Sequence, residues 1–197
     1  EVLVEWLPRL VTGLHFPKAM RWGTGDLRFA RPIRWLVALL DGEVLPVELD
    51  GVRADRVTRG HRFLAPAPIA LQGAADYVER LREAYVLVDP GERRQAVLDQ
   101  VRQAAAAEGA RALEEPDLVA EVANLVEYPA AVVGGFNPDY LQLPREVLIT
   151  PMREHQRYFP LVDEAGRLLP KFIAVSNGPR TDMGLVRSGN EKVLAAR

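Results

Sequence analysis

Residues 157–177 read RYFPLVDEAGRLLPKFIAVSN, two apolar runs on either side of the turn-forming EAGR at 164–167. Apolar runs around a short Gly-containing turn indicate a β-hairpin. A second such pattern, PIRWLVALLDGEVLPVELDG at 32–51, is centred on Asp41-Gly42, a strong hairpin signal. Pro46 places an edge or a bulge in its second run. The chain therefore carries predicted strands toward both ends.

Helical periodicity dominates the region between these hairpins. Val97, Leu98 and Val101 form one apolar stripe in a helix predicted to begin near Pro90 and to end at Gly109. Helices are also predicted at 1–12, 74–84, 116–128, 144–156 and 189–197, and strands at 68–71, 85–89 and 129–136. This mixture predicts an α+β fold, in which the strand-rich ends meet in one mixed sheet and a helical subdomain lies at its side.

The composition is that of a folded protein, with 48% hydrophobic and 26% charged residues in 197. No apolar run approaches the roughly 20 residues of a membrane-spanning helix, so we expect a soluble protein. The absence of Cys excludes disulfides and thiolate metal sites, and it fits the reducing cytoplasm. The three His residues are far apart, which argues against a zinc site. The start at Glu1 and the helix-like end predict a fragment of a longer protein.

The net charge of −2 conceals an uneven distribution along the chain. Residues 15–62 and 144–197 each carry nine Lys or Arg against six Asp or Glu, whereas residues 72–127 carry six against twelve. Of the 25 basic residues, 22 are Arg, which suits bidentate phosphate contacts, although a GC-rich genome explains the same ratio. Two basic stretches thus flank an acidic, helical middle.

The best candidate for a phosphate site is TRGHRF at 58–63. Arg59, His61 and Arg62 surround Gly60, which permits close approach of a ligand to the backbone, and Arg56 extends the basic run. The alternative is a β-bulge whose charges are only solvated.

Two further clusters combine cations with polar or aromatic side chains. Lys18, Arg21 and Trp22 could grip nucleotides, although in this region Phe29 and Trp35 are better explained as core residues rimmed by cations. The third cluster, at 153–158, adds Arg157 to the candidate RNA contacts, and its His155 is either a general base or a hydrogen-bonding residue. No nucleotide-phosphate motif is present, so no cofactor is expected in this chain.

Several stretches together resemble the β subunit of bacterial-type glycyl-tRNA synthetase, and they occur in the same order over the whole chain. They are PKAMRWG (17–23), FARPIRWLVALL (29–40), DRVTRGHRF (55–63), LVAEVANLVEYPAAVVGGF (118–136), LPREVLITPMREHQRYFPL (143–161), FIAVSN (172–177) and SGNEKVLAAR (188–197).

The resemblance implies an α2β2 ligase whose α subunit holds the glycine and ATP site, with Mg, while the β subunit recognises tRNA(Gly). It also implies a fold like the editing-like module of phenylalanyl-tRNA synthetase β subunits, here at 1–71 and 128–197, with 72–127 as an inserted helical linker. No catalytic residue transfers to this chain by resemblance. We therefore expect an accessory tRNA-binding module, with two alternatives. One is a hydrolase of mischarged tRNA that uses His155 or His61, and the other is a scaffold that joins subunits.

Overall fold

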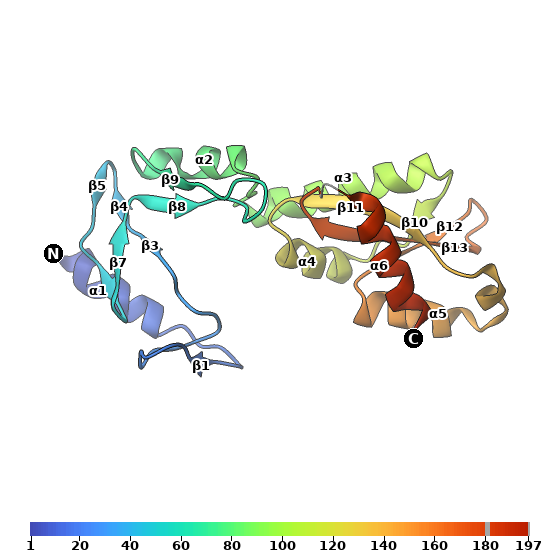
Figure 1. Cartoon of the computed structure of the whole chain (residues 1–197), viewed down its shortest axis with the longest axis horizontal. Helices are drawn as coiled ribbons and strands as arrows, with labels where there is room; N and C mark the ends of the chain where they lie inside the picture. Colours follow the sequence, from blue (N-terminus) through green and yellow to red (C-terminus); the bar gives the residue numbers. More distant parts are fainter. Residues whose placement is uncertain (180–181, 197) are drawn as a thin grey trace. The chain divides into compact units, whose positions relative to one another are not determined.

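The computed structural model describes residues 1–179 and 182–196, which divide into two compact units, Glu1–Ala84 and Tyr85–Arg197 (Figure 1). Both units mix helices with small sheets, so the predicted α+β class is confirmed. Within the described residues, no helix is long and apolar enough to cross a membrane.

The first unit consists mainly of short strands. Its elements are α1 (Val2–Thr12), β1 (Met20–Arg21), β2 (Arg28–Phe29), β3 (Leu36–Val37), β4 (Leu39–Leu40), β5 (Glu43–Val44), β6 (Glu48–Leu49), β7 (Val52–Asp55), β8 (Val57–Arg59), β9 (Pro68–Ala70), a 3₁₀ turn (Ala74–Asp76) and α2 (Tyr77–Glu83).

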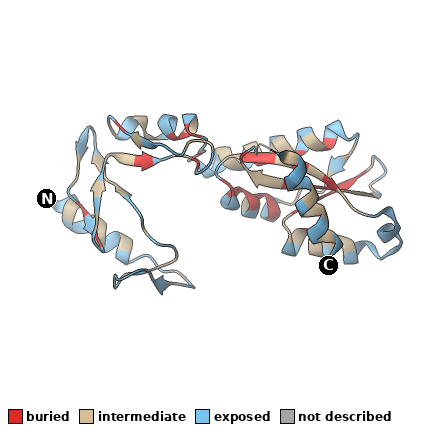
Figure 2. Cartoon of the chain, in the orientation of Figure 1, coloured by how far each residue is buried: buried red, intermediate tan, exposed pale blue. Residues whose placement is uncertain are grey.

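Tight turns join some strand pairs of the first unit, and the other pairs connect more distant segments. β4 and β5 pair antiparallel around Asp41-Gly42, where Asp41 adopts φ +51°, so the predicted hairpin is confirmed. β7 pairs antiparallel with β6 and parallel with β3, and β8 pairs antiparallel with β9. The buried side chains of this unit include Leu71, Leu81 and His61. In contrast, α1 buries none of its residues (Figure 2).

The second unit is built on one larger sheet. Its elements are α3 (Pro90–Ala107), β10 (Arg111–Ala112), α4 (Pro116–Leu125), β11 (Pro129–Gly135), a 3₁₀ turn (Pro138–Gln142), α5 (Arg145–Thr150), a π-helical turn (Pro151–His155), β12 (Phe159–Val162), β13 (Leu168–Asn177) and α6 (Met183–Ala195).

The four strands of this sheet lie in the order β10-β12-β13-β11, and each neighbouring pair is antiparallel. The hairpin predicted at 157–177 is confirmed as β12 and β13, with Gly166 at φ +78° in the turn. β11 follows β13 residue by residue, from Pro129 opposite Asn177 to Gly135 opposite Lys171. The Asn177 side chain also accepts hydrogen bonds from the backbone of residues 127 and 128, which anchors the start of β11.

Helices pack on both faces of the sheet. On one face, Val97 and Val101 of α3 and Val122 of α4 meet Phe159 and Ile173. The other face buries a second cluster, whose members are Met152, Tyr158, Phe172 and Ala174, with Phe136, Leu148 and Leu194 packed against them. The stripe predicted for α3 thus faces the core.

Two predictions about the strands are wrong. Residues 85–89 form no strand, because the segment makes a turn at Tyr85 (φ +59°) and an extended link that donates one hydrogen bond from Leu87 to Glu127. The described strands also form five separate sheets, and no sheet combines strands from residues 1–71 and 128–197. The predicted domain ranges, with 72–127 as a linker, stay a prediction. In this structure residues 85–127 pack within the second unit.

Candidate nucleic-acid interface

The RGHR sequence at 59–62 begins at the last residue of β8 and continues into the turn that follows, with Arg59 and Arg62 exposed and His61 buried. Gly60 is required here for packing, because a Cβ at this position would lie 2.4 Å from Ala84 Cβ and 2.8 Å from Ala84 O. The amide of His61 donates to that same Ala84 carbonyl at 2.8 Å. Gly60 therefore lets β8 end against α2, a different role from the ligand approach expected from the sequence.

His61 organises the turn that follows. Its ring is 1% exposed, and Nδ1 accepts hydrogen bonds from the amides of Phe63 (3.3 Å) and Leu64 (3.2 Å). A ring nitrogen that accepts carries no hydrogen, so the ring proton lies on Nε2. In this conformation His61 presents almost no surface to an RNA or to a hydrolytic water. It holds the turn instead.

This turn leaves two arginines outside, each beside an aromatic ring. The guanidinium carbon of Arg59 lies 5.9 Å from the ring centre of Trp35, and that of Arg62 lies 5.6 Å from the ring centre of Phe63. Both distances fall within the range of a cation–π interaction. The rings are themselves on the surface, Trp35 44% and Phe63 61% exposed. We call these four residues the Arg–aromatic surface.

Other arginines of the same unit already have partners. Arg53 pairs with Glu48 at 2.9 Å, and Arg21 with Asp26 at 3.5 Å. The Arg56 guanidinium donates to three backbone carbonyls, those of Gly42 (3.1 Å), Leu71 (3.1 Å) and Gln72 (3.4 Å). Arg56 thus clamps the β4–β5 turn to the segment after β9.

Arg59 and Arg62 differ from these neighbours, because in the part of the chain that the structure describes neither guanidinium forms an ion pair or a hydrogen bond. Both side chains are exposed. An exposed arginine without a carboxylate partner keeps its charge available for a phosphate.

The second predicted cluster lies around the β1–β2 ribbon. A hollow of about 700 Å³ is lined by Lys18, Trp22 and Arg28, among others. The Trp22 indole donates to the carbonyl of Phe29 at 2.9 Å, and Arg28 donates to that of Ala19 at 2.9 Å. Lys18 is exposed. The structure therefore brings Lys18 and Trp22 to one hollow, in which Trp22 is fixed by the backbone.

Arg157 belongs to the second unit and is held by an acidic helix. Its Nε lies 2.5 Å from Glu121 Oε1 of α4, and the neighbouring Arg153 pairs with Glu115 just before α4. These ion pairs attach the π-helical turn to α4. His155 is exposed at the end of that turn.

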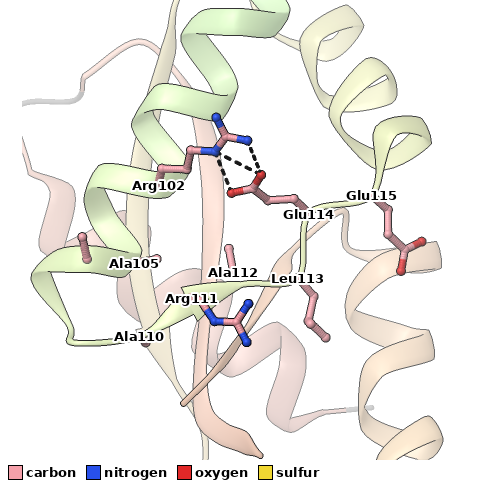
Figure 3. A pocket seen from close by; sticks show the side chains of 9 residues that line it. Arg102, Ala105, Ala110, Arg111, Ala112, Leu113, Glu114 and Glu115 are labelled. Carbon is pink, nitrogen blue, oxygen red and sulfur yellow. Dashed lines mark hydrogen bonds and ion pairs between the residues drawn. The ribbon is translucent and has the colours of Figure 1, made fainter. Parts of the chain in front are cut away.

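A hollow of about 680 Å³ lies in the second unit between the end of α3 and residues 110–115 (Figure 3). Small side chains such as Ala105 leave the space, and Arg102 bridges it with a bidentate contact to Glu114 at 2.7 to 3.1 Å. The hydrogen bonds to Glu114 raise the pKa of the Arg102 guanidinium. The contact with Glu114 neutralises Arg102, whereas the exposed Arg111 also lines the hollow. Within the described residues, no cluster of three metal-ligating side chains occurs.

The family model described as glycyl-tRNA synthetase beta subunit matches residues 1–197. The chain belongs to this family. The glycine–tRNA ligase beta subunits of Desulforamulus reducens and Moorella thermoacetica are 52% and 53% identical to it, over 197 and 196 residues. The beta subunit of Clostridioides difficile is 48% identical over 197 residues. Each comparison covers all of the chain and 28% of the relative.

For this glycyl-tRNA synthetase family member, the sequence predicted the two arginines as candidate contacts but not the rings that the structure places beside them. Trp35 was expected in the core and Phe63 was not among the predicted contacts, although both rings are exposed next to a guanidinium. The adjacency of Arg62 and Phe63 was a readable local signal. The contact between Arg59 and Trp35 could not be predicted from the sequence, because 24 positions separate the two residues in the chain.

Proposed function

We propose that this chain binds tRNA and positions it for a glycine–tRNA ligase, without itself joining glycine to the tRNA. The observation that carries the proposal is the state of Arg59 and Arg62, which are exposed and, among the described residues, form no ion pair. Phosphate groups are the natural partners of such guanidiniums, and each neutralised phosphate releases counterions. Lys18 is a further exposed cation of the same unit, whereas Arg21 pairs with Asp26.

Family membership supports the class of reaction. The relatives are named beta subunits of glycine–tRNA ligase, and the chain spans 28% of their length. In our proposal, an α subunit uses ATP and Mg to attach glycine to tRNA(Gly), within an α2β2 assembly that contains two β subunits. This chain would need no cofactor of its own, and it would act in the cytoplasm without a membrane partner. The likeness of its fold to the editing-like module of phenylalanyl-tRNA synthetase β subunits is part of the same proposal.

The test replaces Arg59 and Arg62 together by Gln in the full-length ligase. We expect weaker tRNA(Gly) binding and a plot of log affinity against log salt that is flatter by about one unit per lost phosphate contact. Arg53→Gln is the matched control, because Arg53 is also exposed but already pairs with Glu48. Unchanged affinity and slope in the double variant would remove both residues from the interface.

Steady-state kinetics separate binding from chemistry in the same double variant. A residue that only holds tRNA should raise the KM for tRNA and leave kcat unchanged. A lower kcat at saturating tRNA would contradict a purely positioning role.

A further inference from the structure

We propose that the Arg–aromatic surface binds the bases of unpaired RNA nucleotides, one stacked at the Trp35–Arg59 pair and another at the Arg62–Phe63 pair. This inference rests on the proposed function and names the part of an RNA that the surface recognises. It starts from the two guanidiniums, each within 6 Å of the centre of an exposed aromatic ring.

The exposure of these rings is the first argument. Large apolar side chains stabilise the fold when they are buried, and Trp35 and Phe63 contribute little in this way, since they are 44% and 61% exposed. The backbone that carries Phe63 is nevertheless well supported, because Thr58 of β8 is buried opposite Ile69 and the buried His61 holds the turn. Trp35 directly precedes β3, which pairs with β7. Both rings are therefore exposed side chains on backbone that lies in or next to paired strands and a hydrogen-bonded turn.

The chemistry of the pairs is the second argument. A guanidinium held near a ring adds a planar, charged group to an aromatic surface, and unstacked RNA bases pack on both kinds of plane. The same arginine can contact the phosphate of the nucleotide that it stacks. In a duplex the bases are already stacked on one another, so a duplex can use the charges but not the rings.

The space beside Trp35 is the third argument. A hollow of about 400 Å³ is lined by Trp35, Val37, Thr58 and Tyr77, among others. Its walls therefore include two aromatic residues and an apolar strand side chain. An unpaired base that packs on Trp35 could enter this hollow, whereas a base pair within a helix could not leave its stack to do so.

The experiment measures binding of the full-length ligase to two fluorescein-labelled probes, a single-stranded oligouridylate and a blunt RNA duplex, over a range of salt concentrations. The variants are Trp35→Leu and Phe63→Leu, which leave every charge in place. Each should weaken single-strand binding about tenfold, the size of one base–aromatic stack, without changing the salt slope. Duplex binding should stay the same.

Three further variants make the result specific. Trp35→Phe keeps a ring and should retain most of the affinity, whereas Arg59→Lys keeps the charge but loses the plane, and so should weaken single-strand binding at an unchanged salt slope. Trp6→Leu is the control, because Trp6 is a comparably exposed ring with no cation over it among the described residues. Equal urea midpoints for all variants establish that they fold.

The stacking proposal is overturned if Trp35→Leu and Phe63→Leu bind the single strand as the parent does, or if they lose duplex binding equally. It is also overturned if an acidic peptide displaces the single strand at lower concentration than competing RNA does, which would indicate a protein partner. Loss of tRNA binding in the Arg59 and Arg62 double variant, without loss in the two Leu variants, would leave the proposed function standing and remove only the stacking.

Discussion

Replacement of Gly134 by Ala should destabilise the second unit, because Gly134 lies under an aromatic ring. In the β11–β13 pair Gly134 is opposite Phe172, and a Cβ on Gly134 would lie 2.5 Å from Phe172 Cζ and 2.9 and 3.0 Å from Cε2 and Cε1. The ring is fully buried and stacks on Tyr158, with centroids 4.5 Å apart and planes at 11°. It cannot move away without disturbing the core, and such overpacking costs about 1–3 kcal/mol.

Urea unfolding of the chain measures this cost. With a slope of about 2 kcal/mol/M, the midpoint should fall by about 0.5–1.5 M. Gly135→Ala is the matched control, because among the described residues a Cβ on Gly135 would meet only Pro170 O at 3.5 Å and Glu191 Oε1 at 4.0 Å. These are ordinary contacts, so Gly135→Ala should change the free energy of unfolding by no more than about 0.5 kcal/mol.

A double-mutant cycle attributes the cost to the ring. Phe172→Leu removes the atoms that the new Cβ would meet, so Gly134→Ala should cost about 1 kcal/mol less in that background than in the parent. If Gly134→Ala leaves the parent midpoint unchanged, or costs the same in both backgrounds, the packing argument is refuted.

Two more predictions concern Arg56 in the first unit and Asp163 in the second. Arg56→Lys should lower the free energy of unfolding of the first unit by about 1 kcal/mol, because one ammonium group cannot reach both the Gly42 and the Leu71 carbonyls. The salt dependence of RNA binding should stay the same, and a changed salt dependence with unchanged stability would make Arg56 an RNA contact instead. In the β12–β13 turn, hydrogen bonds from the backbone and guanidinium of Arg167 hold the pKa of Asp163 below its ordinary value of 3.8. The pKa of Asp163 is lower in the folded than in the unfolded chain, so its contribution to stability is full above pH 3.8 and is lost as the pH falls through the folded pKa. In a plot of the free energy of unfolding against pH, Asp163→Asn should therefore reduce the loss of stability at acid pH. An unchanged loss would contradict a stabilising role for the Asp163 carboxylate.

Local sequence signals were sufficient wherever an element depends on its own residues. The turns at Asp41-Gly42 and Gly166, the Pro90 start of α3 and the two apolar runs that form β12 and β13 could all be predicted, because backbone preference and hydrophobic pattern act within a few positions. The strand predicted at residues 85–89 is absent, since Val and Leu form a strand only where a partner strand is present.

The candidate interface was readable only in part. The sequence predicted Arg59 and Arg62 as candidate contacts, because a local cluster of cations around a Gly can be recognised from the sequence alone. It could not separate them from Arg56 and Arg157, which the structure engages with backbone carbonyls and with Glu121. Ion pairing depends on which side chains meet in space, and no local pattern reports that.

The sequence by itself determined the α+β class, most helix and strand positions and the resemblance to the glycyl-tRNA synthetase β subunit, because these depend on short-range periodicity and on the order of residues. Tertiary structure alone decided that His61 is buried as the support of a turn, that Trp35 is exposed beside Arg59, and that the strands form separate sheets. Burial and charge pairing arise from contacts between residues distant in the chain, so they exist only once the chain has folded.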